Sequence, residues 1–322
     1  MSGGVFISKL GRKGTMIANS IFFALSYLVL VLAQNVTMLL IGRFLTGMAS
    51  GITTIATPTY VSEIASPSVR GMLGSSFQLM VTIGVLYVGI VGAFVDWRWL
   101  SVACLALAVL WGLMMLFCHE SPFYLLSKNK YEKARTSLQF FRGHSEIDEE
   151  LNEIKETIDE AGRKTFQITN LVETVNLRPL IVALMLMVGQ QMSGVNAVIF
   201  FSVTIFNAAK TQLNSLVENI IVGGVQVGAT ALAAILIDRL GRRILLISSA
   251  LIMIFSLYGL GVYFWFLNSR PAFAESLSFL PLGSLCLFIF AFSIGFGPIP
   301  WLMMSEIFSP EVKGITSSIS SK

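Results

Sequence analysis

Charged residues are scarce in this chain: Asp, Glu, Lys and Arg make up 12% of its 322 residues, about half of their usual share of roughly 25% in soluble proteins. Histidine and cysteine are scarcer, with 2 and 3 copies, and the cysteines lie in or beside apolar runs. No disulfide framework, metal-ligand spacing, Ser/His/Asp arrangement, phosphate-binding glycine loop or basic stripe with aromatics is visible. We therefore expect no enzyme, no cofactor, no metal site and no nucleic-acid partner.

Apolar residues dominate instead. They form 55% of the chain, and the mean hydropathy is +0.77. A soluble core cannot absorb so much apolar surface, whereas a bundle of membrane-spanning helices can. The chain also holds 24 Phe and 27 Gly, and glycine is frequent where transmembrane helices pack closely. The composition predicts an all-α membrane protein with the lipid bilayer as a partner.

Eight apolar runs are each long enough to cross a bilayer as a helix, which takes about 18 residues or more. They are residues 16–33, 38–60, 73–95, 100–117, 179–206, 216–237, 244–267 and 280–305. If the basic cluster at residues 9–13 is cytoplasmic, alternation of the spans puts most of the 22 Lys and Arg residues on that side. This asymmetry follows the positive-inside rule. The exceptions on the outer side are Arg43, Arg98, Lys210 and Arg270.

A polar interval divides the spans into two groups of four. Within it, Tyr131, Ala134, Leu138 and Phe141 recur at helical spacing, and residues 147, 151, 154 and 158 repeat the pattern. We predict three parts: an N-terminal half bundle at 1–118, a cytoplasmic linker of short amphipathic helices at 119–178, and a C-terminal half bundle at 179–322.

Two short motifs occur once in each half. Residues 8–13 read Ser-Lys-Leu-Gly-Arg-Lys, and residues 238–243 read Asp-Arg-Leu-Gly-Arg-Arg. A Ser-Glu pair at 62–63 and another at 305–306 each precede a proline and a basic residue before glycine. The duplication indicates two pseudo-symmetric halves, as in transporters. Interhelical ion pairs that gate the cytoplasmic side, with plain interfacial anchoring as the alternative, are expected at Glu63, Arg70, Asp238, Arg239, Arg242, Arg243 and Glu306.

The stretch at 190–196 reads Gln-Gln-Met-Ser-Gly-Val-Asn inside an apolar run. Each amide is costly in hydrocarbon unless it finds a hydrogen-bond partner. Uncharged amides offer donors and acceptors together, which suits a neutral polyhydroxylated solute. Gly194 loosens the helix at the same place. The stretch predicts a polar solute site near mid-membrane, and the alternative is hydrogen-bonded helix packing.

These features together resemble the sugar porters of the major facilitator superfamily, which include the facilitative glucose transporters and the insect facilitated trehalose transporters. The matching stretches are residues 42–44, 60–63, 70–71, 120–122, 190–196, 238–243 and 297–301. Their order is that of the family. Members have twelve spans, and the eight found here correspond to the third through the tenth, so the resemblance implies a fragment truncated at both ends.

The resemblance also implies a site. Sugar contacts are expected at Gln78, Gln190, Gln191, Asn196, Gln226 and Trp301. Phe200 and Phe201 take the place of the family's tyrosine pair at the outer gate. Gly297, Pro298 and Pro300 are expected to form a hinge, because each proline removes a backbone donor and breaks or kinks its helix. Three positions depart from the family pattern: Ser8, Phe123 and Ser293 stand where charged residues are usual.

The expected function is transport of a neutral sugar, a hexose or a trehalose-like disaccharide, by alternating access and facilitated diffusion. No carboxylate is expected in mid-span, which favours a uniporter over the alternative of proton-coupled symport. The sequence also leaves open a truncated, non-transporting protein that binds sugar or regulates full-length porters, and a transporter of a different organic solute. The plasma membrane is the expected location, with an intracellular vesicle membrane as the alternative. A glycosylation sequon begins at Asn35.

Overall fold

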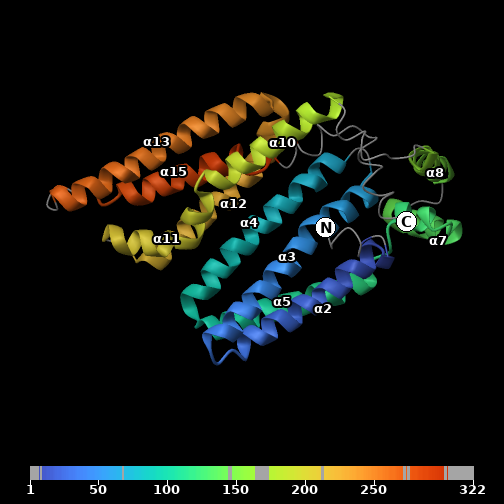
Figure 1. Ribbon diagram of the computed structural model, residues 1–322, viewed down its shortest axis with the longest axis horizontal. Coiled ribbons are helices and arrows are strands. Elements are labelled where there is room, and N and C mark those ends of the chain that lie inside the picture. The colour runs from blue at the N-terminus through green and yellow to red at the C-terminus, as the bar shows by residue number, and fades with distance from the viewer. Residues whose placement is uncertain are drawn as a thin grey trace. The chain divides into compact units, whose positions relative to one another are not determined.

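The computed structural model describes residues 7, 9–66, 69–143, 147–163, 174–211, 214–270, 273, 276–300 and 303. Side chains at 70–72, 74–75, 160–163, 174–180, 183 and 238–239 lie outside this description. The chain forms two compact units: residues 1–77 with 95–170 and 309–322, and residues 78–94 with 171–308. In the part of the chain that the structure describes, every regular element is a helix (Figure 1).

The first unit contains three long apolar helices, α2 (Arg12–Val31), α3 (Val36–Ile64) and α5 (Trp97–Phe117). Helix α2 packs along both α3 and α5. Asn19 ties α2 to α3, since its side-chain amide donates to the Ala49 carbonyl at 3.0 Å and to the Thr53 hydroxyl at 2.8 Å. Helix α4 (Arg70–Phe94) begins in this unit and ends in the second.

Three short helices continue the first unit: α6 (Pro122–Ser127), α7 (Tyr131–Arg142) and α8 (Asp148–Arg163). Their apolar faces form a small core of their own, and the members at the expected helical spacing include Ala134, Leu138, Leu151 and Ile154. Tyr131, at the start of α7, is exposed instead. Short helices with apolar inner faces therefore occur in the segment expected to be the linker, and its role as a cytoplasmic linker stays a prediction.

The second unit holds α10 (Thr174–Met192), α11 (Val195–Ala209), α12 (Ser215–Leu240), α13 (Arg242–Ser269) and α15 (Leu280–Ile294). Helix α15 packs against both α12 and α13, and α13 runs beside it in Figure 1. The core of this unit is apolar and lies around Phe206, Leu285, Phe288 and Ile289, which are almost fully buried.

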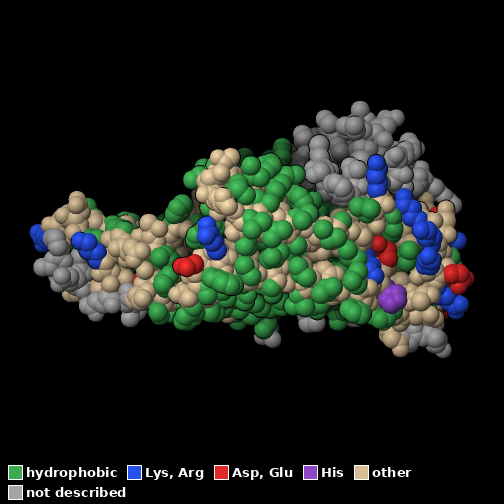
Figure 2. Space-filling view, turned by 90° about the horizontal axis from the view of Figure 1, so that it is seen from below, with side chains coloured by type: hydrophobic (Ala, Val, Ile, Leu, Met, Phe, Trp, Pro, Cys, Tyr) green, Lys and Arg blue, Asp and Glu red, His purple; other side chains and the backbone are tan. Residues whose placement is uncertain are grey.

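Among the described residues, seven helical segments are long and apolar enough to span a membrane, and residues 184–209 of α10 and α11 count as one of them. The eighth expected span is a shorter apolar helix, Leu280–Ile294, which ends in a turn. Large apolar side chains face outward on the spans, and Figure 2 shows them as a continuous field with few charges. Lipid is the solvent that such a surface requires, so the chain is a multi-pass membrane protein.

The repeated basic motifs form matching turns. Gly11 precedes α2 with φ 83° and ψ 174°, and Gly241 precedes α13 with φ 81° and ψ 155°. A positive φ of this size disfavours residues with a Cβ. The predicted turn role of both glycines is confirmed, and it reproduces the sequence repeat at the level of the backbone.

Candidate functional site

The carboxamide stretch lies at a break between two helices. Helix α10 ends at Met192, and α11 starts at Val195 after Gly194, which adopts the left-handed conformation with φ 81°. The turn is held locally, because the Ser193 hydroxyl donates to the Gln190 carbonyl at 2.7 Å. The expected loosening at Gly194 is therefore a complete interruption of the helix.

Two amides face one another across this break. The side-chain amide of Asn196 donates to the side-chain oxygen of Gln191 at 2.7 Å, and both residues are exposed. Within the described part of the chain, the side-chain nitrogen of Gln191 donates to no protein acceptor. An exposed pair of this kind can exchange hydrogen bonds with hydroxyl groups of a solute.

Gln190 behaves differently, although it is adjacent to Gln191. It is buried, and its side-chain nitrogen donates to two backbone carbonyls, those of Phe296 at 2.7 Å and Gly297 at 2.8 Å. These carbonyls lie in the turn at residues 295–298, after the end of α15. Gln190 therefore holds the interrupted end of α15 to the interrupted end of α10.

Helix α15 breaks before Pro298 and Pro300, which follow it in the chain. The helix ends at Ile294, four residues before Pro298, and the chain turns through residues 295–298 before helical residues resume at 299. A proline ring clashes with the carbonyl four residues before it, so the distortion falls on the preceding turn. Gly295 also belongs there, because a Cβ at this position would collide with Ser249 and with the Leu245 carbonyl. The turn that contains the expected hinge residues Gly297 and Pro298 thus starts at Gly295, and the hinge role stays a prediction.

The remaining predicted sugar contacts differ in burial where the structure describes them. Gln226 is buried on α12, and Gln78 is half-buried on α4. Trp301 lies outside the described residues. Ser293 is buried, and its hydroxyl has no hydrogen-bond partner among the described residues. The structure joins Gln191 with Asn196, and Gln190 with the turn after α15. The six residues as one sugar site stay a prediction.

The two phenylalanines expected at the outer gate lie on α11. Phe200 is 77% exposed and Phe201 is 59% exposed. They project from a helix whose other face is buried through Val198, Ser202 and Phe206. Their aromatic surface is therefore available to a ligand, to lipid or to another segment, and their role as a gate stays a prediction.

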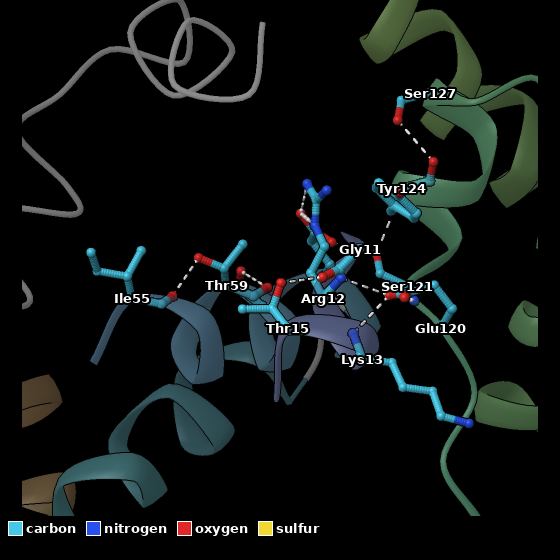
Figure 3. A network of polar contacts seen from close by, with 12 residues as sticks. Gly11, Arg12, Lys13, Thr15, Ile55, Thr59, Glu120, Ser121, Tyr124 and Ser127 are labelled. Carbon is cyan, nitrogen blue, oxygen red and sulfur yellow. Dashed lines mark hydrogen bonds and ion pairs between the residues drawn. The ribbon is translucent and has the colours of Figure 1, made fainter. Parts of the chain in front are cut away.

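A charged network joins the turn before α2 to α3 in the first unit (Figure 3). The guanidinium of Arg12 donates to one carboxylate oxygen of Glu63, at 3.1 Å from Nε and 2.7 Å from a terminal nitrogen. Both side chains are mostly buried, at 11% and 14% exposure. The Ser121 hydroxyl donates to the other oxygen of Glu63. Low exposure limits screening by water, so the attraction between the charges increases, and the cost of removing both charges from water opposes it.

Glu120 caps the start of α2 from a distant part of the chain. Its carboxylate accepts from the backbone amides of Arg12 and Lys13, both at 3.0 Å. The first amides of a helix lack partners within the helix, and a carboxylate there also interacts favourably with the helix dipole. Arg12 lies over the ring of Tyr124 as well, with 5.2 Å between its guanidinium carbon and the ring centroid.

Of the seven expected gating residues, Glu63 is the one that forms a described ion pair. Its partner is Arg12, which was not among the seven. The side chains of Arg70, Asp238, Arg239 and Glu306 lie outside the description. Arg242 is half-buried and Arg243 is exposed. Sequence reasoning placed Arg12 and Glu120 in family motifs without assigning them to the gate. The signal was available, because both motifs carry charge at the ends of expected spans.

The structure also describes the surroundings of Phe123 and the His, Cys, Asp and Glu residues that could bind a metal. Phe123, where the family carries a charged residue, packs against the apolar core of the linker helices. Within the described residues, no group of three or more His, Cys, Asp or Glu could hold a metal ion. Ser8 lies outside the described residues.

Comparisons with known proteins agree on one family. The family profile described as sugar (and other) transporter matches residues 1–322. Facilitated glucose transporter member 8 of solute carrier family 2 from Mus musculus is 40% identical over 333 residues, which cover 98% of this chain and 68% of that protein. The facilitated trehalose transporter Tret1 of Anopheles gambiae is 39% identical over 320 residues, which cover 98% of this chain and 40% of that protein.

Among solved structures, the partially occluded inward-open xylose transporter XylE from E. coli superimposes with a TM-score of 0.78 at 23% identity. The superposition covers 99% of this chain and 75% of XylE. At this identity the likeness concerns the fold.

Proposed function

We propose, from the premise that the chain belongs to the sugar (and other) transporter family, that it carries a neutral sugar across a membrane by facilitated diffusion. The substrate class is a hexose or a trehalose-like disaccharide. The observation that carries this proposal is the match to glucose and trehalose transporters at 40% and 39% identity along nearly the whole chain. The family consists of transporters and not of enzymes.

The fold is that of the major facilitator superfamily. We infer that its two halves alternate access to a sugar held near mid-membrane. The interrupted helices support this inference, because non-helical backbone at membrane depth is tolerated where it is buried in protein or lines a cavity. The exposed amides of Gln191 and Asn196 supply donors and acceptors at one interruption.

In this proposal the sugar contacts are Gln78, Gln190, Gln191, Asn196, Gln226 and Trp301. Phe200 and Phe201 close the outer side, and the turn at Gly297, Pro298 and Pro300 bends. Arg12 and Glu63 hold the cytoplasmic end of their half together and separate when that side opens. The ion pair can break reversibly, because even partly buried pairs contribute only a few kcal/mol to the free energy of the state that they hold.

Uptake of radiolabelled glucose and trehalose into proteoliposomes tests the proposal. We expect saturable uptake down the gradient, competed by the unlabelled sugar. In Q191A and N196A the KM should rise about two- to tenfold, because each loses one or two neutral hydrogen bonds to the sugar. Asn207, an exposed residue at the other end of α11, provides the matched control N207A, which should keep its KM. Absence of saturable uptake of either sugar would contradict the proposal.

Proton-coupled symport is the alternative mechanism. The same proteoliposomes distinguish it, because a symporter accumulates sugar against its gradient when the interior is alkaline, and a protonophore abolishes this accumulation. A uniporter only equilibrates the sugar. We propose the plasma membrane as the location, with an intracellular vesicle membrane as the alternative that microscopy of the tagged protein decides.

A further inference from the structure

A carboxyl group is buried at one end of the second unit. Glu218 lies in the first turn of α12 and is 1% exposed. This end of α12 is opposite to the basic turn at residues 240–243, so the expected orientation places it toward the outer side of the membrane. Burial of a full charge costs far more free energy than burial of a neutral polar group. The state of this carboxyl therefore matters to the packing around it.

The carboxyl has a neutral hydrogen-bond partner. The Thr211 hydroxyl, from the turn before α12, donates to one oxygen of Glu218 at 2.7 Å. Lys210 is the basic residue nearest to Glu218 in the sequence, and it is exposed whereas Glu218 is buried. Among the described residues, the three ion pairs lie elsewhere and none includes Glu218.

The same region fastens the end of α11. Tyr263, also 1% exposed, donates its hydroxyl to the Ala209 carbonyl at 2.6 Å. Ser202 on α11 donates to the side-chain oxygen of Asn219, the residue after Glu218, at 2.6 Å. Thr211 follows α11 directly and is held by Glu218 itself. Because α11 is separated from α10 by the turn at Gly194, these contacts control its position at this end.

We propose that Glu218 is a proton-binding site, and that the proton it exchanges with outside water regulates the placement of α11. The step adds one proton to the carboxylate and gives a carboxylic acid, which can donate a hydrogen bond that the carboxylate cannot. After protonation, one oxygen of Glu218 still accepts from Thr211, and the carboxyl also carries an O–H group that can donate. This new donor changes the hydrogen bonds at the end of α11. Proton binding is independent of the proposed sugar transport, whereas its effect on transport depends on that function.

Infrared difference spectroscopy of the purified protein in lipid tests proton binding without any transport assay. We expect a carboxylic-acid C=O band that changes in amplitude with pH and shifts in heavy water. The band should be lost in E218Q, in which a neutral amide of the same shape can still accept from Thr211. The control is D96N, since Asp96 is an exposed carboxylate before α5 with no side-chain cap hydrogen bond, and D96N should keep the band.

A second variant, T211V, distinguishes loss of the proton site from a general effect of E218Q on folding. In T211V the carboxyl remains but its hydroxyl donor is removed, so the band should persist with a displaced titration midpoint. The proposal is overturned if the titrating band survives in E218Q, or if no carboxylic-acid band titrates in the unsubstituted protein.

Sugar uptake at a series of outer pH values then tests regulation. The unsubstituted protein and D96N should share one pH dependence, and E218Q should lose it. An unchanged pH dependence in E218Q overturns the regulatory role. If uptake itself is absent while the infrared band behaves as expected, the sugar-transport proposal fails and the proton site stands.

Discussion

Neighbouring residues of the same type have different surroundings in this protein. Gln190 and Gln191 are about 100° apart around α10, and one is buried while the other is exposed. Gln190 donates to two carbonyls in the turn that follows α15, those of Phe296 and Gly297. Gln191 accepts from Asn196. One amide thus joins helices, whereas the other is exposed, and its contact with a solute stays a prediction.

Replacement of each glutamine by glutamate tests this difference. Q190E removes the donor and puts a carboxylate oxygen against the carbonyls of Phe296 and Gly297, so it should lower the free energy of unfolding by about 2–4 kcal/mol. Q191E, the matched control, should change it by less than about 0.5 kcal/mol, because its side chain is exposed. Thermal unfolding in nanodiscs measures both. Equal destabilisation in the two variants would show that Gln190 does not hold the hinge.

At the scale of elements, interruptions distinguish the second unit from a plain helix bundle. Helix α10 stops before Gly194, and α15 stops at Ile294 before a turn. Both ends are joined through Gln190, so the two breaks form one connected feature. Backbone groups freed at such breaks must be satisfied inside the membrane, and the Gln190 amide does so for two of them. The half-helices on either side can then change angle without breaking a continuous helix.

Gly194 makes one of these breaks possible, and G194A tests its contribution. The left-handed conformation costs an alanine about 1–2 kcal/mol, and no neighbouring atom would meet the added Cβ, so the cost is backbone strain alone. G47A serves as control, because Gly47 is a helical residue of α3 with the same open surroundings. It should be neutral or stabilising by up to about 1 kcal/mol. Chemical denaturation in detergent should separate the variants, and a G194A protein as stable as G47A would contradict the strain.

At the scale of the whole molecule, the linker helices are attached to the first unit by specific contacts. Arg142 of α7 pairs with Glu150 of α8 at 2.6 Å and donates to the Ile64 carbonyl, at the end of α3, at 2.8 Å. Its side chain is 11% exposed. A single guanidinium thus connects two linker helices with a membrane helix.

R142A should loosen this attachment. Loss of the buried hydrogen bonds costs about 1–2 kcal/mol, which corresponds to a factor of about 5–30 in local opening. Backbone amides of α7 and α8 should exchange hydrogen faster by that factor in mass-spectrometric exchange. R135A is the control, because Arg135 pairs with Asp148 at 3.3 Å with 41% and 62% exposure, and exposed pairs contribute little. Similar exchange in both variants would contradict a special role for Arg142.

Much of the fold follows from local sequence. The apolar runs predicted the spans, helical spacing predicted α7 and α8, and Gly11, Gly194 and Gly241 marked turns that the structure places at positive φ. The stop of α15 at Ile294 was missed by a few residues, because the expectation centred on the prolines and not on the turn before them. Glu218 was missed as well, since a single acid near the end of an apolar run looks like an interfacial residue.

Composition, apolar length and glycine positions are therefore sufficient for the fold class, the spans and the basic turns, because each is a property of a short stretch of chain in lipid or at its surface. The partners of buried polar side chains do not follow from such short stretches. Arg12 with Glu63, Glu120 with the start of α2, and Gln190 with the end of α15 join residues between 51 and 108 positions apart. Helix packing alone brings such groups within hydrogen-bond distance, and it also buries Glu218, because burial depends on which neighbouring helices cover a side chain.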